Sequence, residues 1–388
     1  MKRIILYTGK GGVGKTTIAA AAAILSAKKG NKTLVISTDP AHSLRDVYEE
    51  EIGPEPKKLA ENLYAQEIDV YYSVDKYWGQ LTDYIQSLFS WMNVDNVMAE
   101  EFSVFPGMEE VSSFLWVYNH FKENNFDVII VDSAPTGETL RLLSLPDVAR
   151  WWLVKIFPIE RKVLKVVRPA VRVVTNMPLP KDNTYDAIEN LFEKLDSIHK
   201  IFSDPKITTI RLVLNLEKMV IKETLRAYTY LSLYGYPVDS MLINRRLPTN
   251  LDHPYFKEAK DIQHEYRKEV DDLFSPLPIF EAQLSPKEIL GQKALHQFGK
   301  DLYKNSDPTK IFYEGKPYEI VKEDGHYNLL VKLPFITKDK INLYQVSEDL
   351  TIQIENQKRN FFLPKFLAKK NVKKANFEEG FLKITFEN

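Results

Sequence analysis

Cysteine is absent from this chain of 388 residues. Its absence excludes disulfide bonds, iron–sulfur clusters and zinc sites with thiolate ligands, because each of them needs cysteine sulfur. The seven histidines are scattered without the spacing of a metal-binding motif. The chain also lacks an opening apolar segment typical of a signal peptide, and it has no uncharged run long enough to cross a bilayer. We therefore expect a cytoplasmic protein, or one of a similar soluble compartment such as the plastid stroma.

A bias toward one sign of charge is missing as well. The 52 lysines and arginines balance 53 aspartates and glutamates, which leaves a formal net charge of −1. No overall positive field attracts nucleic acid, so we expect no nucleic-acid partner unless a local basic patch forms. The length exceeds the usual size of a single domain, which favours two domains.

The most informative stretch is residues 9–16, which read Gly-Lys-Gly-Gly-Val-Gly-Lys-Thr. They fit the phosphate-binding pattern G-x-x-x-x-G-K-[ST], between an apolar β-prone run at 4–7 and an alanine-rich helical segment at 17–29. Glycines let backbone N–H groups surround phosphate oxygens, and the positive end of the following helix faces the same anion. We predict that this loop binds a nucleoside triphosphate through Gly9, Lys10, Gly11, Gly12, Val13, Gly14, Lys15, Thr16 and Thr17.

Three side chains of the loop have distinct expected roles. Lys15 should reach the β- and γ-phosphates, and the Thr16 hydroxyl should ligate Mg²⁺. Lys10 is a second lysine, which the pattern does not require. It is either a solvated loop residue or a cation that acts on a triphosphate, including that of a partner subunit.

Two aspartates follow predicted strands. Asp39 comes directly after the apolar run 33–38, and Asp132 ends the apolar run 127–132. In a doubly wound sheet both would stand at the carboxyl edge of the strands, where ligands bind. With Thr16 they are candidate Mg²⁺ ligands, some through water, and Asp39 is also suited to activate the attacking water. The alternative for Asp39 is a helix cap, because Asp39-Pro40 looks like a cap followed by a first-turn proline.

Residues 10–17 resemble the deviant phosphate loop of the MinD-like dimeric ATPases. Residues 39–44 (Asp-Pro-Ala-His-Ser-Leu) and 132–139 (Asp-Ser-Ala-Pro-Thr-Gly-Glu-Thr) are similar to stretches of the arsenite-pump and tail-anchored-protein-targeting ATPases. The resemblance covers roughly the first three quarters of the chain. It implies ATP hydrolysis with Mg²⁺ by a homodimer in which Asp39 positions water, Lys15 holds phosphates and Lys10 acts across the interface. Asp39, Lys10 and Lys15 are therefore the candidate catalytic residues.

The same resemblance implies further contacts with the nucleotide. Asn244 ends the predicted strand 240–244, and Arg245 follows it. In the family an Asn at this position reads the adenine edge, although by itself Asn244 is also typical of a residue that closes a strand into a turn. Pro135 lies in the family's second switch loop. Pro278 lies in the last strand, whose proline loop covers the base.

These patterns predict a P-loop NTPase domain over residues 1–308, of the α/β class, with a doubly wound and mostly parallel sheet. A helical subdomain is expected within 73–119 and 150–205. Between residues 150 and 176 apolar side chains recur every three or four positions beside a stripe of lysines and arginines. This pattern indicates either ordinary core with a solvated face or a groove with basic flanks, which in the family binds apolar helices.

Beyond a linker at residues 305–309 the pattern changes to short alternating strands, at 327–334, 341–344 and 350–354. Such strands predict an all-β sandwich over residues 309–388. The ending 375–384, which contains Gly380-Phe381-Leu382, resembles the α-crystallin domain of small heat-shock proteins. We expect this domain to lack catalytic groups and either to modulate client handling or to act as a passive appendage.

The leading hypothesis is an ATPase that couples its nucleotide state to the binding of an apolar client protein or peptide, and that meets membranes only indirectly. An ATP-gated holdase with slow hydrolysis is the alternative. A partition-type ATPase is disfavoured by the balanced charge and by the lack of a terminal amphipathic helix. An arsenite pump is disfavoured because the chain offers no thiols to As(III).

Overall fold

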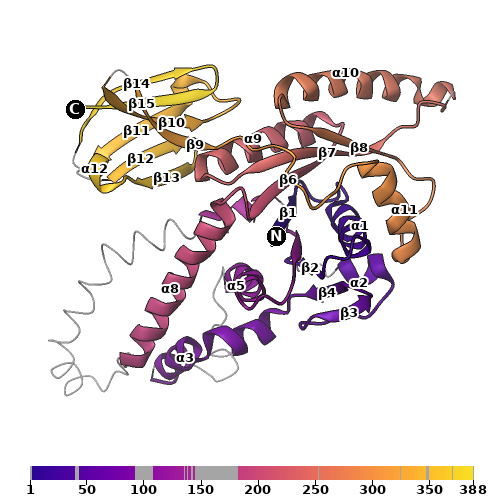
Figure 1. Ribbon diagram of the computed structural model, residues 1–388, viewed down its shortest axis with the longest axis horizontal. Helices are drawn as coiled ribbons and strands as arrows, with labels where there is room; N and C mark the ends of the chain where they lie inside the picture. The colour runs from indigo at the N-terminus through magenta and orange to yellow at the C-terminus, as the bar shows by residue number, and fades with distance from the viewer. Residues whose placement is uncertain are drawn as a thin grey trace.

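The computed structural model describes residues 2–39, 43–91, 108–134, 136–137, 139–140, 143–144, 182–251, 253–323, 325–346, 349–368 and 370–387. Its centre is an eight-stranded sheet with the order β3-β4-β2-β5-β1-β6-β7-β8 (Figure 1). All neighbouring strands are parallel except β3 and β4. The strands are β1 (Arg3–Thr8), β2 (Thr33–Ser37), β3 (Lys57–Ala60), β4 (Leu63–Glu67), β5 (Val128–Asp132), β6 (Thr208–Asn215), β7 (Val238–Arg246) and β8 (Ile279–Gln283). The predicted fold class is confirmed.

Helices cover this sheet, and its inner strands β1, β2, β5 and β6 are buried along their whole length. The alanine run at residues 19–23 is fully buried, so α1 packs closely on its neighbours. On the side of α1 that faces α11, a Cβ at Gly299 of α11 would lie only 3.0 Å from Leu25 Cδ1 of α1, so the two helices are in close contact. The helices around the sheet are α1 (Lys15–Lys28), α2 (Ser43–Tyr48), α9 (Lys218–Tyr234), α10 (Lys257–Phe274) and α11 (Gly291–Tyr303), with a short 3₁₀ turn η1 (Pro254–Phe256) before α10.

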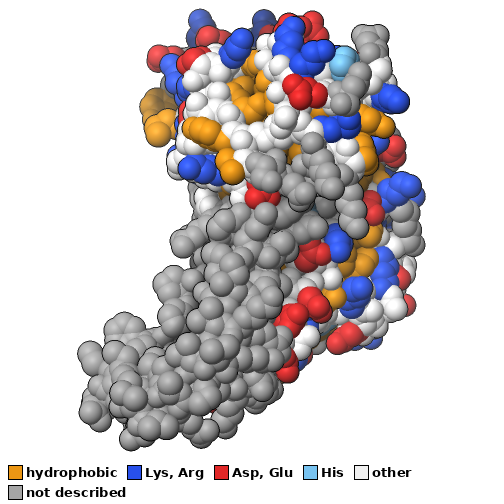
Figure 2. Space-filling view, turned by 90° about the vertical axis from the view of Figure 1, so that its left-hand side faces the viewer, with side chains coloured by type: hydrophobic (Ala, Val, Ile, Leu, Met, Phe, Trp, Pro, Cys, Tyr) orange, Lys and Arg blue, Asp and Glu red, His pale blue; other side chains and the backbone are white. Residues whose placement is uncertain are grey.

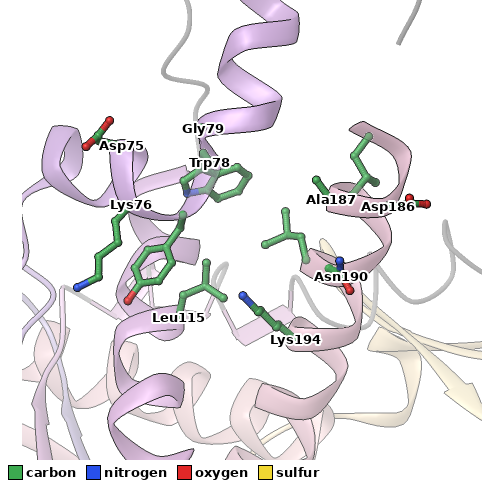
Figure 3. Close-up of a pocket in the computed structure, with 12 residues that line it drawn as sticks. Asp75, Lys76, Trp78, Gly79, Leu115, Asp186, Ala187, Asn190 and Lys194 are labelled. Atoms are coloured by element: carbon green, nitrogen blue, oxygen red, sulfur yellow. The ribbon is translucent and has the colours of Figure 1, made fainter. Parts of the chain in front are cut away.

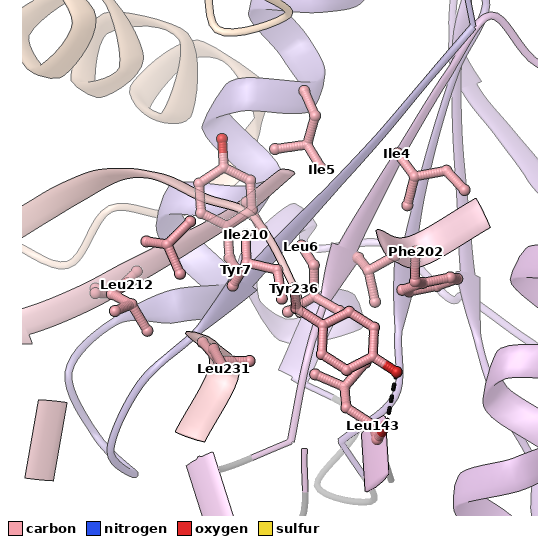
Figure 4. Close-up of a cluster of buried hydrophobic side chains, with 14 of the residues drawn as sticks. Ile4, Ile5, Leu6, Tyr7, Leu143, Phe202, Ile210, Leu212, Leu231 and Tyr236 are labelled. Carbon is pink, nitrogen blue, oxygen red and sulfur yellow. Dashed lines mark hydrogen bonds between the residues drawn. The ribbon is translucent and has the colours of Figure 1, made fainter. Parts of the chain in front are cut away.

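The core beside β1 joins residues that are far apart in the chain (Figure 4). Ile4 and Leu6 of β1 belong to one buried cluster with Phe202 and Tyr236. The Tyr236 hydroxyl donates a hydrogen bond of 2.6 Å to the backbone carbonyl of Leu143. The end of α9 is thereby tied to the segment that follows β5.

Three longer helices extend to one side of the sheet: α3 (Val70–Trp91), α5 (Met108–Lys122) and α8 (Asp182–Ser203) (Figure 1). They occupy the ranges in which helical structure was predicted. The stripes predicted between residues 150 and 176 lie outside the described residues. Within the described ranges, no helix has both the length and the apolar character that crossing a membrane requires.

The C-terminal part forms two antiparallel sheets, with the orders β14-β15-β10-β9 and β11-β12-β13. Alternate side chains such as Val331, Ile352 and Ile384 are buried between them, which confirms the predicted sandwich. Figure 2 shows acidic and basic side chains interspersed over the face of this sandwich that it displays. Its elements are β9 (Tyr318–Glu323), β10 (His326–Lys332), η2 (Lys338–Lys340), β11 (Ile341–Val346), β12 (Asp349–Ile354), β13 (Gln357–Phe362), α12 (Lys365–Ala368), β14 (Val372–Glu378) and β15 (Phe381–Phe386).

The segment that leads from α11 to the sandwich is fastened to the main sheet by buried charges. Arg211 and Asp239 form an ion pair at 3.2 Å, and both side chains are fully buried. Arg211 Nη2 donates to the carbonyl of Lys310 at 3.0 Å, and Asp239 accepts from the backbone N–H of Phe312 at 3.3 Å. Residues 310–312 therefore complete a buried polar cluster of the main sheet, and they do not form a free tether.

Candidate nucleotide site

The loop between β1 and α1 has the conformation that its glycines permit. Gly14 has a φ of 92°, and a Cβ there would lie 2.3 Å from the side-chain nitrogen of Asn244. A Cβ at Gly9 would lie 2.2 Å from the carbonyl oxygen of Val213. Both glycines are thus required by close approach. At Gly11, by contrast, a Cβ would meet nothing within 4 Å.

The two lysines of the loop occupy different environments. Lys15 is the first residue of α1, only 6% exposed, and its Nζ donates to the carbonyl of Lys10 at 3.4 Å. Lys10 itself is half-buried, next to the exposed Gly11 and Gly12. A buried ammonium at a helix N-terminus is suited to an anion held by the loop, whereas Lys10 is the more exposed of the two lysines.

Asp132 is fully buried at the carboxyl end of β5. Burial raises the pKa of its carboxyl to about 7, while the Thr16 hydroxyl and the Lys15 ammonium oppose this rise and Asp39 adds to it. Apart from the Thr16 hydroxyl, neither carboxylate oxygen of Asp132 has a hydrogen-bond partner within the described ranges of the chain. An orphaned buried carboxylate is costly unless something binds it, and a divalent cation fits this position.

The donor set around Asp132 resembles Mg²⁺ sites that are completed by phosphate. Among the described residues, no cluster of three or more His, Asp or Glu side chains could hold a metal on its own. Mg²⁺ in nucleotide sites needs only one or two protein oxygens, because phosphates and water supply the rest. Asp132 and the neighbouring Thr16 therefore fit Mg²⁺ only together with a phosphate ligand.

Asp39 follows β2 at the same edge of the sheet. Its backbone N–H donates to Ser37 Oγ at 3.2 Å, and the neighbouring N–H of Thr38 donates to the carbonyl of Asp132 at 2.9 Å. The Thr38 hydroxyl in turn accepts from the backbone N–H of Ala134 at 3.2 Å. The segments after β2 and β5 are thereby linked next to the phosphate loop. Residues 40–42 lie outside the described residues, and so does Pro135.

A third carboxylate at this edge was not predicted. Glu67 ends β4, is 2% exposed, and aligns with Ser37 of β2, which also aligns with Asp132. Its two oxygens accept from the backbone N–H of Arg45 at 3.0 Å and from Arg45 Nε at 3.1 Å. Glu67 thus binds the first turn of α2. The alternative considered for Asp39, a cap of the following helix, depends on residues 40–42, which lie outside the described residues.

A cavity of about 660 Å³ adjoins the phosphate loop. One side comes from the loop and α1, and the other from the ends of β7 and β8 and the segment that follows. Its position, beside the loop and at the carboxyl edge of a parallel sheet, fits a base and ribose. The lining residues are Gly14, Thr17, Asp46, Val47, Asn244, Arg245, Gln283, Leu284, Ser285, Pro286, Lys287, Glu288, Ile289 and Leu290.

The structure brings Asn244 and Arg245 to this cavity. Asn244 is 7% exposed, and its side-chain nitrogen donates to the carbonyl of Val13 at 2.8 Å. Its oxygen accepts from the backbone N–H of Arg245 at 2.9 Å. In this structure the amide of Asn244 therefore supports the phosphate loop.

Pro278 is not brought to the cavity. It precedes β8, where its carbonyl accepts from the N–H of Met241, whereas the cavity lies beyond Gln283 at the opposite end of that strand. The proline that lines the cavity is Pro286. Since β7 and β8 are parallel and Ile243 aligns with Glu281, the end of β8 and the residues after it lie beside Asn244, and the start of β8 does not. The expected proline loop is thus at the end of the strand and not at its start.

A second cavity, of about 510 Å³, lies between α3, α5 and α8 (Figure 3). Trp78 of α3 and Leu115 of α5 face the side of α8 that carries Asn190 and Lys194. Trp78 is fixed by a hydrogen bond of 2.9 Å from its indole N–H to Ser112. The other lining residues are Asp75, Lys76, Tyr77, Gly79, Asp186, Ala187, Ile188 and Leu191. The cavity therefore combines apolar walls with charged rims.

Comparisons with known proteins agree with this geometry. Residues 2–304 match the family model described as "Anion-transporting ATPase", and residues 324–386 match the "HSP20-like domain found in ArsA". "Putative arsenical pump-driving ATPase 1" of Aquifex aeolicus is 38% identical over 387 residues, which cover 97% of this chain and 98% of that protein. "ATPase ASNA1 homolog" of Entamoeba dispar is 31% identical over 76% of this chain and 92% of its own length. "ATPase get3" of Pyrenophora tritici-repentis is 30% identical over 79% and 93%, respectively.

Proposed function

The chain belongs to the anion-transporting ATPase family and is an ATPase. From this premise we propose that it hydrolyses ATP with Mg²⁺ as a homodimer. We further propose that its nucleotide state controls the binding of an apolar client. The family resemblance and the α-crystallin-like ending predicted from the sequence are confirmed. The observation that carries the proposal is the buried carboxylate of Asp132 beside Thr16 and Lys15, since apart from the Thr16 hydroxyl it has no hydrogen-bond partner in the described part of the chain.

Each residue of the site has a separate proposed role in phosphoryl transfer. Lys15 would hold the β- and γ-phosphates at the start of α1, and Thr16 and Asp132 would hold Mg²⁺, which neutralises phosphate charge. Asp39, beside them at the end of β2, would orient the attacking water and accept its proton. Glu67 would keep α2 and the segment before it in position through Arg45. Asn244 would fix the phosphate loop and border the base together with Arg245.

The proposed dimer is supported by the presence of Lys10 in the loop. Lys10 is more exposed than Lys15, whose ammonium is buried at the start of α1. A second cation in the loop is suited to the phosphates of a second subunit that closes over the site. In this proposal ATP, contacted from both sides, favours the closed dimer.

The proposed client is apolar because of the cavity between α3, α5 and α8. Trp78 and Leu115 give it apolar walls, and its rim carries charges of both signs, from Lys76 and Lys194 and from Asp75 and Asp186. An arsenical is disfavoured as the ligand of this protein, since the chain has no cysteine. The combination fits an apolar helix with polar ends.

Asp39→Asn tests the chemistry. The substitution keeps the size of the side chain and removes the base, so ATP binding should persist while single-turnover hydrolysis falls by at least about a hundredfold. Lys15→Ala should instead weaken ATP binding itself. Titration calorimetry measures binding, and phosphate release measures hydrolysis. Hydrolysis at the wild-type rate in Asp39→Asn would refute the role of Asp39, and wild-type ATP affinity in Lys15→Ala would refute that of Lys15.

The same Asp39→Asn variant tests the client. Trapped with ATP, it should bind a labelled apolar helix of about 20 residues more tightly than the ADP form does. Ile188→Glu, which places a charge at a partly exposed position of the cavity wall, should remove this difference and leave hydrolysis intact. Equal peptide affinity in the ATP and ADP forms would refute coupling to an apolar client.

A further inference from the structure

Helix α2 contributes a carboxylate to the wall of the nucleotide cavity. Asp46 and Val47 of α2 line this cavity of about 660 Å³ together with Gly14 of the phosphate loop and Thr17 of α1. Val47 is buried, whereas Asp46 is exposed. The Asp46 carboxylate is therefore available to a ligand in a cavity whose position fits a base and ribose.

Hydrogen bonds near both ends of α2 fix the position of this helix. In its first turn, the backbone N–H and the Nε of Arg45 donate to the buried Glu67 at 3.0 and 3.1 Å. At its last residue, the Tyr48 hydroxyl donates to the carbonyl of Ala20 in α1 at 3.1 Å. Asp46 lies between these two anchored residues, so its backbone is held in place beside α1. An acceptor that is fixed before the ligand arrives loses little conformational entropy on binding.

The segment after β8 joins the opposite wall of the cavity to α2. At its start, the N–H of Leu284 donates to the carbonyl of Arg246 at 2.8 Å, next to Arg245. At its end, a Cβ at Gly291 would lie 2.9 Å from a carboxylate oxygen of Glu49, the residue that follows α2. The segment thus runs from the end of β7 to the end of α2, and it lines the cavity along this course.

The side chains that line the cavity suit different parts of a nucleoside. Apolar side chains are suited to the faces of a base, and the segment after β8 supplies them with Leu284, Pro286, Ile289 and Leu290. The hydroxyls of a ribose can donate hydrogen bonds, for which a carboxylate is a strong acceptor. Among the described residues that line the cavity, the carboxylates are those of Asp46 and Glu288.

The two carboxylates differ in how they are held. Ribose connects the base to the phosphates, which the loop and the start of α1 would bind, and α2 lies against α1 one turn beyond Thr17 through the contact with Ala20. Glu288 is an exposed residue of the irregular segment between β8 and α11. Asp46 has the shorter side chain and stands on an anchored helix, so ordering it costs less conformational entropy.

We propose that Asp46 binds the ribose of the nucleotide by accepting a hydrogen bond from its 2′- or 3′-hydroxyl, and that it thereby selects ribonucleotides over deoxynucleotides. This inference rests on the proposed function, because it requires the cavity to hold the nucleoside of ATP. A carboxylate that binds ribose in this way is a known feature of dinucleotide-binding α/β folds. Glu67 and Arg45 act on the nucleotide only indirectly, by holding the helix that carries Asp46.

A purely structural role of Asp46 leads to a different expectation. Asp46 is an acidic residue in the first turn of α2, where a negative charge also stabilises a helix. Loss of that effect would weaken the binding of every nucleotide by the same factor. Loss of a ribose contact weakens only the binding of nucleotides that carry the hydroxyl.

Titration calorimetry with ADP, 2′-deoxy-ADP and 3′-deoxy-ADP, in the presence of Mg²⁺, tests the proposal without turnover. We expect the wild type to bind ADP at least about tenfold more tightly than one of the two deoxynucleotides, as the loss of one hydrogen bond to a charged group predicts. Asp46→Ala should bind ADP about tenfold more weakly and should bind that deoxynucleotide within about twofold of the wild type. Asp46→Asn keeps a neutral oxygen and should retain part of the preference.

Glu288→Gln is the matched control, since it neutralises the other carboxylate of the cavity, and it should keep the preference of the wild type. The inference is overturned if the wild type shows no preference, if Asp46→Ala retains the full preference, or if Glu288→Gln loses it. In each of these cases nucleotide binding, and with it the proposed function, still stands. Failure of the wild type to bind either ADP or ATP would overturn both.

Discussion

Acid should destabilise this protein through a single histidine. His120, in α5, is 6% exposed, and its Nε2 lies 2.9 Å from the Gln66 side-chain oxygen. The Gln66 amide nitrogen donates to the carbonyl of Pro54, so that its oxygen faces His120 and the proton of the neutral ring must be on Nε2. Trp116 stacks on one face of the ring, and Phe126 meets it edge-on, each with a centroid distance of 5.5 Å. Protonation would place a charge in this enclosed position.

Burial lowers the pKa of His120 from 6.5 to about 4; Glu123 and Glu55 oppose this shift, and Lys76 reinforces it. Below pH 6.5 the unfolded chain binds a proton at this residue while the folded chain does not, until pH reaches about 4. The free energy of unfolding therefore falls as pH decreases through this window. A difference of about 2.5 pH units corresponds to about 3 kcal/mol in total, of which about 2 kcal/mol is lost by pH 5.

The assay is urea unfolding at pH 7.5 and pH 5.0, followed by tryptophan fluorescence, for the wild type and for His120→Gln. Glutamine can still donate to Gln66 but does not titrate in this range. The wild type should lose about 2 kcal/mol more than the variant between the two pH values. His264→Gln, at an exposed position of α10, is the matched control and should behave as the wild type does. Equal losses in wild type and His120→Gln would refute the reasoning.

Two further predictions follow from close contacts. Gly14→Ala places a side chain at a backbone φ of 92° and against Asn244, so ATP affinity should fall by at least about tenfold. Gly11→Ala, whose side chain meets open space, should bind ATP as the wild type does in titration calorimetry. Equal ATP affinities of the two variants would contradict the assigned loop geometry. Arg211→Met leaves Asp239 buried without its partner, so chemical denaturation should show a loss of about 3–5 kcal/mol, against little change in the exposed Arg226→Met. A loss in Arg211→Met no larger than that in Arg226→Met would speak against the buried cluster.

The elements that the sequence predicts well are those whose pattern is local. The phosphate loop is specified by its glycines and lysine, and the buried strands around Leu6 and Ile130 by continuous apolar runs. The edge strand β3 was missed because it has four residues and alternates little. The start of α9 at Lys218 is not marked in the sequence, because Glu217 before it makes no side-chain cap.

Long-range partners explain the remaining differences. Glu67 follows a strand, as Asp39 and Asp132 do, but its role is visible only once Arg45 is placed against it. The side chain of Asn244 was expected to read a base, and its contact with Val13 depends on how β7 lies beside the loop. The residues that directly follow the predicted linker, 310–312, are held by Arg211 and Asp239 from distant strands, which the local composition does not reveal.

The fastening of residues 310–312 also bears on how the protein is made. The ribosome delivers the main sheet first, and its fully buried Arg211 and Asp239 then lack the backbone partners that Lys310 and Phe312 later provide. Arg211 and Asp239 pair with each other without these residues, but this end of β6 and β7 gains its full set of hydrogen bonds only after they have emerged. The ATPase fold therefore becomes complete only after the segment that begins the sandwich has been synthesised. A chain released before residue 312 would differ from the full-length protein, because the side chains of Arg211 and Asp239 would lack their hydrogen bonds to Lys310 and Phe312.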